Sequence, residues 1–336
     1  MENIFSPDDI SKWDNLLRNA SRVILATHAH PDGDAIGSVT GLASYLKDRN
    51  INTSIICPNA YPAFLNFLDK EGEIVIYQGN EEFATRLIDC ADLLIAMDVC
   101  GFSRLDELGE LLVNKPVHKI LIDHHPGPCT EEFDLVFSLT QVSSTCELTS
   151  SLLTRWHPDV DFSAAQATSF LAGMYTDTNQ FANSLFSDTF TVASELFRMG
   201  ADNRLIMEKV YGSYTYNRMR LMGYALQKMK LIPRYKAAYI VLTAAELSQF
   251  EFQEGDTEGF ANLPLAIDGV SIAGLFLEKE HYVKVSLRSR GPYPVNGIAK
   301  DVYQGGGHYN AAAGRIKKPV AEMDALFENA LGTIIA

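Results

Sequence analysis

The chain has 336 residues, of which 47% are hydrophobic and 21% are charged, as is ordinary for a soluble globular protein. This length is sufficient for two domains, each with its own core. The formal net charge of −14 argues against a protein that binds long nucleic acid through its phosphates, because such proteins are usually basic. An acidic chain can still bind a small phosphate compound if metal ions or a basic pocket offset the repulsion locally.

The sequence indicates a cytoplasmic protein without a membrane partner. No apolar run approaches the roughly 20 residues that span a bilayer. The stretch 1–9 carries acids where a signal peptide would carry basic residues. The five cysteines are odd in number and scattered, which favours reduced thiols over a disulfide framework or a zinc ribbon.

The first part of the chain alternates buried strands with helical segments, which is typical of a parallel α/β sheet. The first predicted strand leads into a polar loop at 27–34 and then into a helix at Ala35–Leu46. The predicted strands of this part are Arg22–Ala26, Ser54–Cys57, Glu73–Tyr77, Asp92–Asp98, Ile120–Ile122 and Leu135–Phe137.

The middle of the chain is predicted to be helical. Ser144 with Glu147, and Ser163 with Gln166, form the capping-box pattern that opens two helices. Further helices are predicted over 191–199, where Gly200 ends the helix, and over 204–211 and 216–229. We therefore expect an N-terminal domain at 1–190 and a helical linker at 191–230.

A smaller mixed α/β domain is predicted at 231–336, with strands at 238–242, 270–277 and 282–288 and helices at 295–303 and 320–331. Between those helices lies a glycine-rich loop at 305–314, whose backbone amides can approach a phosphate closely. Arg288 and Arg290 are expected to share one face of a strand. Such a pair fits either a phosphate clamp or an ordinary solvated face.

Acids and histidines follow the apolar segments of the first part, mostly where a predicted strand ends. In open α/β sheets, ligands bind outside the carboxyl ends of the strands. Carboxylates that converge there repel one another unless a cation offsets their charge. We expect Gly33 to allow a tight turn, so that the acids beside it can face different metals. The candidate metal ligands are His28, Asp32, Asp34, Asp98, His124 and Asp177.

Imidazole and carboxylate ligands without thiolate favour Mn²⁺, with Mg²⁺, Co²⁺ or Fe²⁺ as alternatives. Two such ions about 3.5–4 Å apart assist in-line displacement at phosphorus, by activating water and by binding substrate oxygens. Taken singly, Asp98 would more often cap a turn, and Asp177 would more often end a helix. Their joint occurrence with the other acids and histidines favours a metal centre.

These residues resemble the motifs of the DHH phosphoesterases, namely His28–Asp34, Asp98, Asp123–His125 and Asp177. The segment 305–314 is similar to the signature of the DHHA1 domain, and the resemblance covers nearly the whole chain. Within the superfamily, the chain is similar to the group of bifunctional oligoribonucleases and pAp phosphatases. One departure is His30, which stands where the family usually has asparagine.

The resemblance implies two Mn²⁺ ions, with Asp98 as the bridge. One ion would be held by His28, Asp32 and Asp98, and the other by Asp34, Asp98, His124 and Asp177. The catalytic set would be Asp98, Asp123, His124 and His125, in which Asp123 orients a ligand and His125 faces the scissile phosphate. In the cleft between the domains, the nucleotide would be bound by His125, Arg288, Ser289, Gly305, Gly306, Gly307 and His308.

The implied activity is that of an Mn²⁺-dependent phosphohydrolase. It would release 5′-mononucleotides from very short RNA and the 3′-phosphate from pAp. Its partners would be a short oligonucleotide or a nucleoside bisphosphate and not long nucleic acid, because the added domains of RecJ-type exonucleases are lacking. The alternatives are a linear or cyclic dinucleotide phosphodiesterase, a pyrophosphatase or exopolyphosphatase, and a non-catalytic nucleotide sensor. Whether the protein forms a homodimer stays open.

Overall fold

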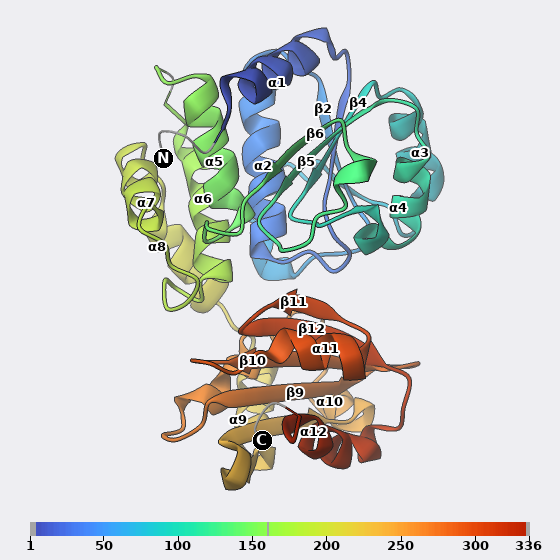
Figure 1. The fold of residues 1–336 in the computed structure, drawn as a ribbon, viewed down its shortest axis with the longest axis vertical. Coiled ribbons are helices and arrows are strands. Elements are labelled where there is room, and N and C mark those ends of the chain that lie inside the picture. The colour runs from blue at the N-terminus through green and yellow to red at the C-terminus, as the bar shows by residue number, and fades with distance from the viewer. Residues whose placement is uncertain (1–4, 160, 334–336) are drawn as a thin grey trace. The chain divides into compact units, whose positions relative to one another are not determined.

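A computed structural model describes residues 5–159 and 161–333 of the chain. The first four residues of the acidic N-terminal stretch lie outside the described residues. The chain divides into two compact units after Ser213, which lies within the segment expected to be a linker (Figure 1). The helices of that segment pack into one unit or the other. Among the described residues, every helix is too short or too polar to cross a bilayer.

The first unit is built on six parallel strands in the order β3-β2-β1-β4-β5-β6. From β1 the chain adds β2 and β3 on one side, and then β4, β5 and β6 on the other. The sheet thus has a topological switch point between β1 and β4, where ligands bind in such folds. The strands match the predicted ones: β1 (Val23–Ala26), β2 (Thr53–Cys57), β3 (Ile74–Ile76), β4 (Leu93–Met97), β5 (His118–Asp123) and β6 (Leu135–Ser138).

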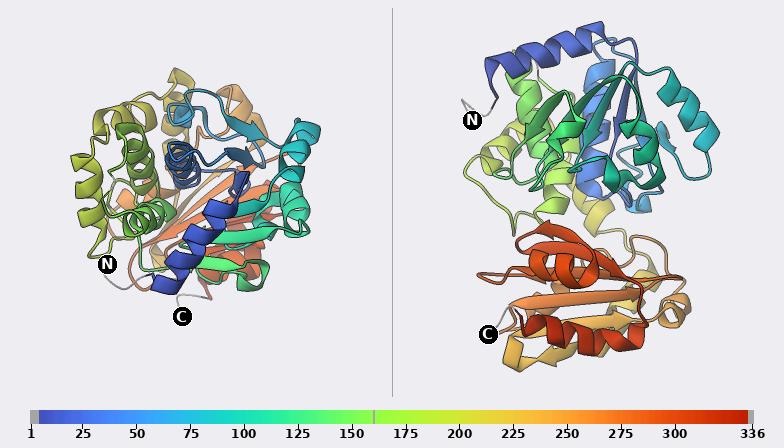
Figure 2. Two further views of the ribbon diagram at one scale, coloured as in Figure 1. Left: turned by 90° about the horizontal axis from the view of Figure 1, so that it is seen from above. Right: turned by 45° about the vertical axis from the view of Figure 1, so that its right-hand side comes forward.

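Helices cover both faces of this sheet (Figures 1 and 2). Successive side chains of a strand point to opposite faces, so Leu25 packs in one core and Ile24 in the other. On one face lie α1 (Pro7–Asn19), α2 (Gly33–Lys47), α5 (Thr145–Trp156) and α6 (Ala164–Asp177), and on the other lie α3 (Glu81–Asp89) and α4 (Asp106–Val113). The unit ends with α7 (Thr189–Arg198), α8 (Asn203–Ile206) and a π-helical turn, Met207–Tyr211.

Helices α2 and α6 approach closely because glycine takes the place of larger side chains at their contact. A Cβ at Gly33 would lie 2.4 Å from Oγ1 of Thr176, and a Cβ at Gly37 would lie 2.5 Å from the carbonyl oxygen of Ser169. The expectation that Gly33 serves a tight turn is wrong, because Gly33 begins α2 and does not have a positive φ. Gly33 instead lets α2 pack closely against Thr176 of α6. This contact keeps Asp177, the last residue of α6, beside α2.

The observed helix ends agree with the predicted capping motifs, with one exception. Ser163 and Gln166 form the predicted capping box of α6, and Gly200 has the left-handed backbone (φ +92°) expected after α7. Ser144 accepts the Glu147 amide at the start of α5, as predicted. The reciprocal bond is not formed, because the carboxylate of Glu147 binds other donors.

The second unit is a mixed sheet in the order β11-β12-β10-β9-β8-β7 with helices on both faces. This confirms the predicted α/β class, with a parallel sheet in the first unit and a smaller mixed sheet in the second. The strands are β7 (Lys230–Ile232), β8 (Ala237–Leu242), β9 (Ile272–Glu278), β10 (Val283–Ser289), β11 (Gly306–His308) and β12 (Ala311–Ile316). The helices are α9 (Tyr216–Lys228), α10 (Ala244–Gln249), α11 (Val295–Tyr303) and α12 (Met323–Leu331).

Two predictions for this unit need correction. The segment 305–314 was expected to be a glycine-rich loop, but most of it forms the antiparallel pair β11 and β12. Glycine and alanine have low strand propensity, so tertiary pairing overrides the local preference. Arg288 and Arg290 do not share a strand, because β10 ends at Ser289.

Candidate metal centre

The polar residues that follow β1, β4 and β5 meet at the switch point of the sheet. Asp98 comes directly after β4 with φ +56°, a conformation that is rare for residues other than glycine and costs free energy. Its amide donates a 3.0 Å hydrogen bond to the carbonyl oxygen of Ile122 in β5. The strained backbone therefore sets the direction of a side chain that is 2% exposed.

His30 also has a left-handed backbone, with φ +57°. Asparagine and histidine both enter this region more readily than most residues. The His30 amide donates a 2.5 Å hydrogen bond to Oδ1 of Asn59, which holds the loop before α2. The exchange of asparagine for histidine is thus accommodated by the backbone at this position.

The first candidate ligand group consists of His28, Asp32 and Asp98. Nε2 of His28 lies 3.5 Å from Oδ2 of Asp98 and 3.9 Å from Oδ1 of Asp32. The other ring nitrogen, Nδ1, lies 2.9 Å from the carbonyl oxygen of Ala29, which leaves Nε2 as the candidate ligand atom. Asp32 is the N-cap of α2 and accepts the amides of Asp34 and Ala35.

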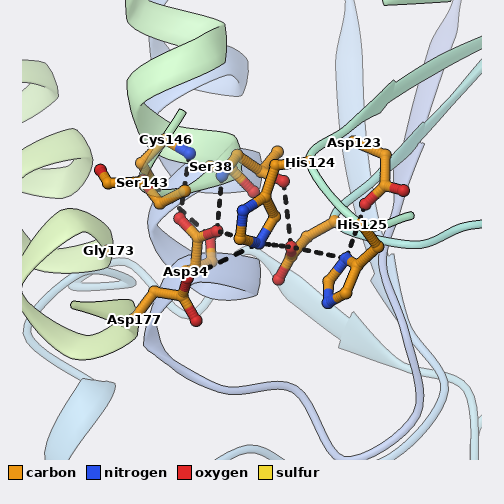
Figure 3. A network of polar contacts seen from close by, with 12 residues as sticks. Asp34, Ser38, Asp123, His124, His125, Ser143, Cys146, Gly173 and Asp177 are labelled. Atoms are coloured by element: carbon orange, nitrogen blue, oxygen red, sulfur yellow. Dashed lines mark hydrogen bonds and ion pairs between the residues drawn. The ribbon is translucent and has the colours of Figure 1, made fainter. Parts of the chain in front are cut away.

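The second candidate ligand group consists of Asp34, His124 and Asp177 (Figure 3). Nε2 of His124 lies 3.8 Å from Oδ2 of Asp34 and 3.6 Å from Oδ2 of Asp177. The same nitrogen lies 3.6 Å from Oδ1 of Asp98. One oxygen of Asp98 therefore faces each group, which is the arrangement that a bridging carboxylate needs.

The first turn of α5 holds the carboxylates of both groups. The amides of Thr145 and Cys146 donate to Oδ2 and Oδ1 of Asp34 at 2.7 and 2.9 Å. The Thr145 hydroxyl donates to Oδ1 of Asp98 at 3.0 Å. Sequence reasoning missed this contribution of Thr145 and Cys146. The available signal was the polar run at 143–145, which leads into the helix.

A third group joins Asp98 to Asp123 and His125. Nδ1 of His125 lies 2.8 Å from Oδ1 of Asp123, a pair that Figure 3 shows. Asp123 is completely buried, and the same nitrogen lies 3.7 Å from Oδ1 of Asp98. Burial alone would lower the pKa of His125, but the bond to Asp123 and the charge of Asp98 raise it to about 9. Asp123 thus orients His125, and the raised pKa favours the protonated form of that imidazole.

The electrostatics of the groups suit divalent cations. Burial, and then the charges of Asp98 and Asp177, raise the pKa of Asp34 well above its usual range. Burial would do the same to Asp98, but hydrogen bonding to His28 and the charges of His125 and His124 lower its pKa. In the described part of the chain, the ion pairs of Asp34 and Asp98 involve histidines only. Carboxylate and imidazole donors without a lysine or arginine partner fit Mn²⁺ or a similar ion.

The remaining candidate residues lie in the second unit. Ser289 is 8% exposed, and its hydroxyl donates to the carbonyl oxygen of Tyr293 and accepts from Asn310. A Cβ at Gly305 would lie 1.9 Å from the carbonyl oxygen of Ala313, so packing requires that glycine. Packing also requires Gly307, whereas a Cβ at Gly306 would meet nothing within 4 Å. Arg288 lies half-buried on β10, and His308 ends β11.

Comparison with family models matches both units of the chain. The model of the DHH family, N-terminal domain, matches residues 22–174. The model of the DHHA1 domain matches residues 235–335. The first match contains the residues of all three groups except Asp177, and the second contains the β11 and β12 pair.

Two named relatives and one solved structure are similar to this chain over most of its length. The bifunctional oligoribonuclease and PAP phosphatase NrnA of Thermus thermophilus is 30% identical, over 93% of this chain and 89% of that protein. The cyclic-di-AMP phosphodiesterase GdpP of Bacillus subtilis is 29% identical over 89% of this chain, which spans only 45% of GdpP. A crystal structure of an exopolyphosphatase-related protein from Bacteroides fragilis superposes with a TM-score of 0.92. It is 35% identical and covers 99% of this chain and 98% of its own.

Proposed function

The chain belongs to the DHH family of phosphoesterases, with a C-terminal DHHA1 domain, and on this premise we propose that it hydrolyses very short oligoribonucleotides and pAp. The products would be 5′-mononucleotides from the oligonucleotide, and AMP with phosphate from pAp. The support is the similarity to NrnA, which extends over nearly the full length of both proteins. The negative charge of the chain agrees with a short substrate, since a long strand would be repelled.

The observation that carries the proposal is the position of Asp98. Its two oxygens lie 3.5 and 3.6 Å from the Nε2 atoms of His28 and His124. We propose that two Mn²⁺ ions bind here, one at His28, Asp32 and Asp98 and one at Asp34, Asp98, His124 and Asp177. Bound divalent cations would acidify a water molecule and offset the negative charge of a phosphate.

The chain's own groups would contribute orientation and charge. We propose that Thr145 and Cys146 hold Asp34 in a fixed direction through their amides, so that no reorganisation is needed during the reaction. The protonated His125, oriented by Asp123, would hydrogen-bond the phosphate oxygens as their charge increases. Its proton could pass to the leaving oxygen, since the pKa of about 9 keeps that proton in place at neutral pH.

The second unit would bind the nucleotide part of the substrate. Gly306 supports this role. Packing does not require a glycine there, and the absence of a side chain leaves space for a ligand beside the backbone. Arg288 would pair with a phosphate, and His308 would contact it from the end of β11. Ser289 and Asn310 tie the end of β10 to the β11–β12 turn, so Ser289 would position these residues from within the unit.

One experiment tests the proposal against its alternatives. Initial rates are measured with Mn²⁺ on pAp, a diribonucleotide, a 24-mer RNA, cyclic di-AMP, pyrophosphate and polyphosphate. The proposal expects the diribonucleotide and pAp to react at least ten times faster than the others. A dominant rate on cyclic di-AMP would favour the activity named for GdpP, and one on pyrophosphate or polyphosphate would favour a pyrophosphatase or exopolyphosphatase. Tight dinucleotide binding without any hydrolysis would indicate a sensor.

A further inference from the structure

Glu147 is a buried acid whose surroundings are unusual. It lies in the first turn of α5 and is 0% exposed. Its Oε2 accepts three hydrogen bonds, from the amide and the hydroxyl of Ser143 at 3.0 and 2.5 Å and from the Thr189 hydroxyl at 2.9 Å. These donors are neutral, and Oε1 has no hydrogen-bond partner. Burying a carboxylate in this way costs free energy, so its retention calls for an explanation.

The residues fixed by Glu147 lead directly to the metal centre. Ser143 precedes α5 by two residues, and Thr189 is the first residue of α7. The two residues after Ser144 are Thr145 and Cys146, which donate to Asp34 and Asp98. The carboxylate of Glu147 therefore holds the short segment from which three donors reach two candidate metal ligands. Figure 3 shows two residues of this segment, Ser143 and Cys146, beside Asp34.

We propose that Glu147 is a positioning residue of the metal centre. It fixes the entry of α5, so that the Thr145 and Cys146 donors hold the carboxylates of Asp34 and Asp98 in the directions that cation binding requires. The inference rests on the metal centre that the proposed function requires. Its test measures metal affinity and needs no substrate.

The charge of Glu147 is the property to test. In Glu147→Gln the shape is kept, but the three donors would face a neutral oxygen, and the amide nitrogen would replace an oxygen that has no hydrogen-bond partner. Hydrogen bonds to a charged acceptor are roughly twice as strong as neutral ones, so the entry of α5 should loosen. Residues that orient metal ligands typically change metal affinity by about 10–100-fold when replaced.

A matched control is Gln166→Met. Gln166 is also buried, at 2% exposed, and joins α6 to Ser44 and Asp48 near the opposite end of α2. It lies 11 residues before Asp177 on the same helix, which is about 16 Å along the axis. Its loss should lower the melting temperature without changing metal affinity, as a merely structural role predicts.

The experiment measures Mn²⁺ dissociation constants by calorimetry at a temperature where each variant is folded. We expect Glu147→Gln to weaken Mn²⁺ binding at least tenfold and Gln166→Met to leave it within twofold. Thr145→Val removes the hydroxyl bond to Asp98, and its effect should be less than additive with that of Glu147→Gln, because both act through the same turn. Wild-type affinity in Glu147→Gln, or equal weakening in Gln166→Met, would overturn the inference.

If Glu147→Gln does not fold, Thr189→Val provides the second variant. It keeps the carboxylate and removes one of its three donors. We expect a threefold or larger loss of Mn²⁺ affinity, and an unchanged affinity would contradict the inference. A wild-type protein that binds Mn²⁺ but does not cleave dinucleotides would overturn the proposed function and leave this inference standing.

Discussion

Nε2 of His28 lies 3.5 Å from Oδ2 of Asp98, while the other oxygen of that carboxylate faces Nε2 of His124 in a second group of candidate ligands. His28 follows β1 and Asp98 follows β4, the two neighbouring strands between which the order of the sheet reverses. The pair therefore stands at the point where a fold of this kind forms its binding crevice.

Asp98→Asn should remove activity without unfolding the protein. Asparagine tolerates the left-handed backbone at this position, so the fold is retained, but the neutral amide cannot bridge two cations. We expect kcat/KM to fall by more than about 100-fold, beyond the range typical of residues that only orient a ligand. Asp106→Asn is the control, because Asp106 also has a positive φ (+48°) but is exposed. Activity of Asp98→Asn within tenfold of wild type would contradict the assignment.

Gly33→Ala should destabilise the first unit. The new Cβ would lie 2.4 Å from Oγ1 of Thr176, and that hydroxyl is held by the carbonyl oxygen of Gly173. Overpacking of this kind costs about 1–3 kcal/mol, and the displaced Thr176 adjoins Asp177. Thermal unfolding and Mn²⁺ titration measure both effects. Gly223→Ala in α9 has open space around it and should be neutral or stabilising. Equal melting temperatures for the two variants would refute the packing argument.

Manganese binding should release protons and strengthen as the pH rises. Burial and neighbouring carboxylates raise the pKa of Asp34, and hydrogen bonding to Asp98, against burial, raises that of His28. Both groups thus hold protons to higher pH than usual, and a cation must displace those protons. Calorimetry in buffers of different ionisation enthalpy counts the protons released. His118→Gln is the control, because His118 is exposed. Mn²⁺ binding to this variant should release as many protons as binding to the wild type. Binding that is independent of pH between 6 and 8 would be the contrary result.

Gly306→Ala should weaken substrate binding and leave stability unchanged. A methyl group at this position meets nothing within 4 Å, so it can only interfere with a ligand that approaches β11. We expect KM for a dinucleotide to rise at least fivefold with a melting temperature within one degree of wild type. Gly297→Ala in α11, which is equally unhindered, should change neither quantity. A wild-type KM in Gly306→Ala would remove Gly306 from the proposed binding surface.

Glu246→Gln should destabilise the protein at neutral pH but not in strong acid. Burial would raise the pKa of Glu246, but hydrogen bonds from Lys228, the Thr243 amide and Tyr224 lower it to about 2. A lowered carboxyl pKa contributes stability above the unfolded value near 4.5, and this contribution is lost as the pH falls through about 2. We expect a difference of roughly 2–3 kcal/mol at pH 7, measured by denaturant unfolding. The exposed Glu280→Gln should show no such difference, and a pH-independent effect of Glu246→Gln would count against the account.

The sequence was sufficient for the strands of the first unit and for the edge at which its polar residues gather. Continuous apolar runs such as Ile120–Ile122 mark buried parallel strands, and the residues after them must meet at one edge. The sequence did not reveal the left-handed backbone of Asp98, because φ at a strand end depends on pairing with β5. It also missed the donors of Thr145 and Cys146, since these amides depend on how α5 packs against α2. The sequence did not predict β11, because glycine has low strand propensity and this strand forms only through its pairing with β12.

The most direct test of the central claim is anomalous diffraction from crystals grown with Mn²⁺. The account predicts two manganese peaks about 3.5–4 Å apart, one on each side of the Asp98 carboxylate. One ion should contact His28 and Asp32, and the other should contact Asp34, His124 and Asp177. A single peak, or two peaks that share no carboxylate oxygen of Asp98, would contradict the account.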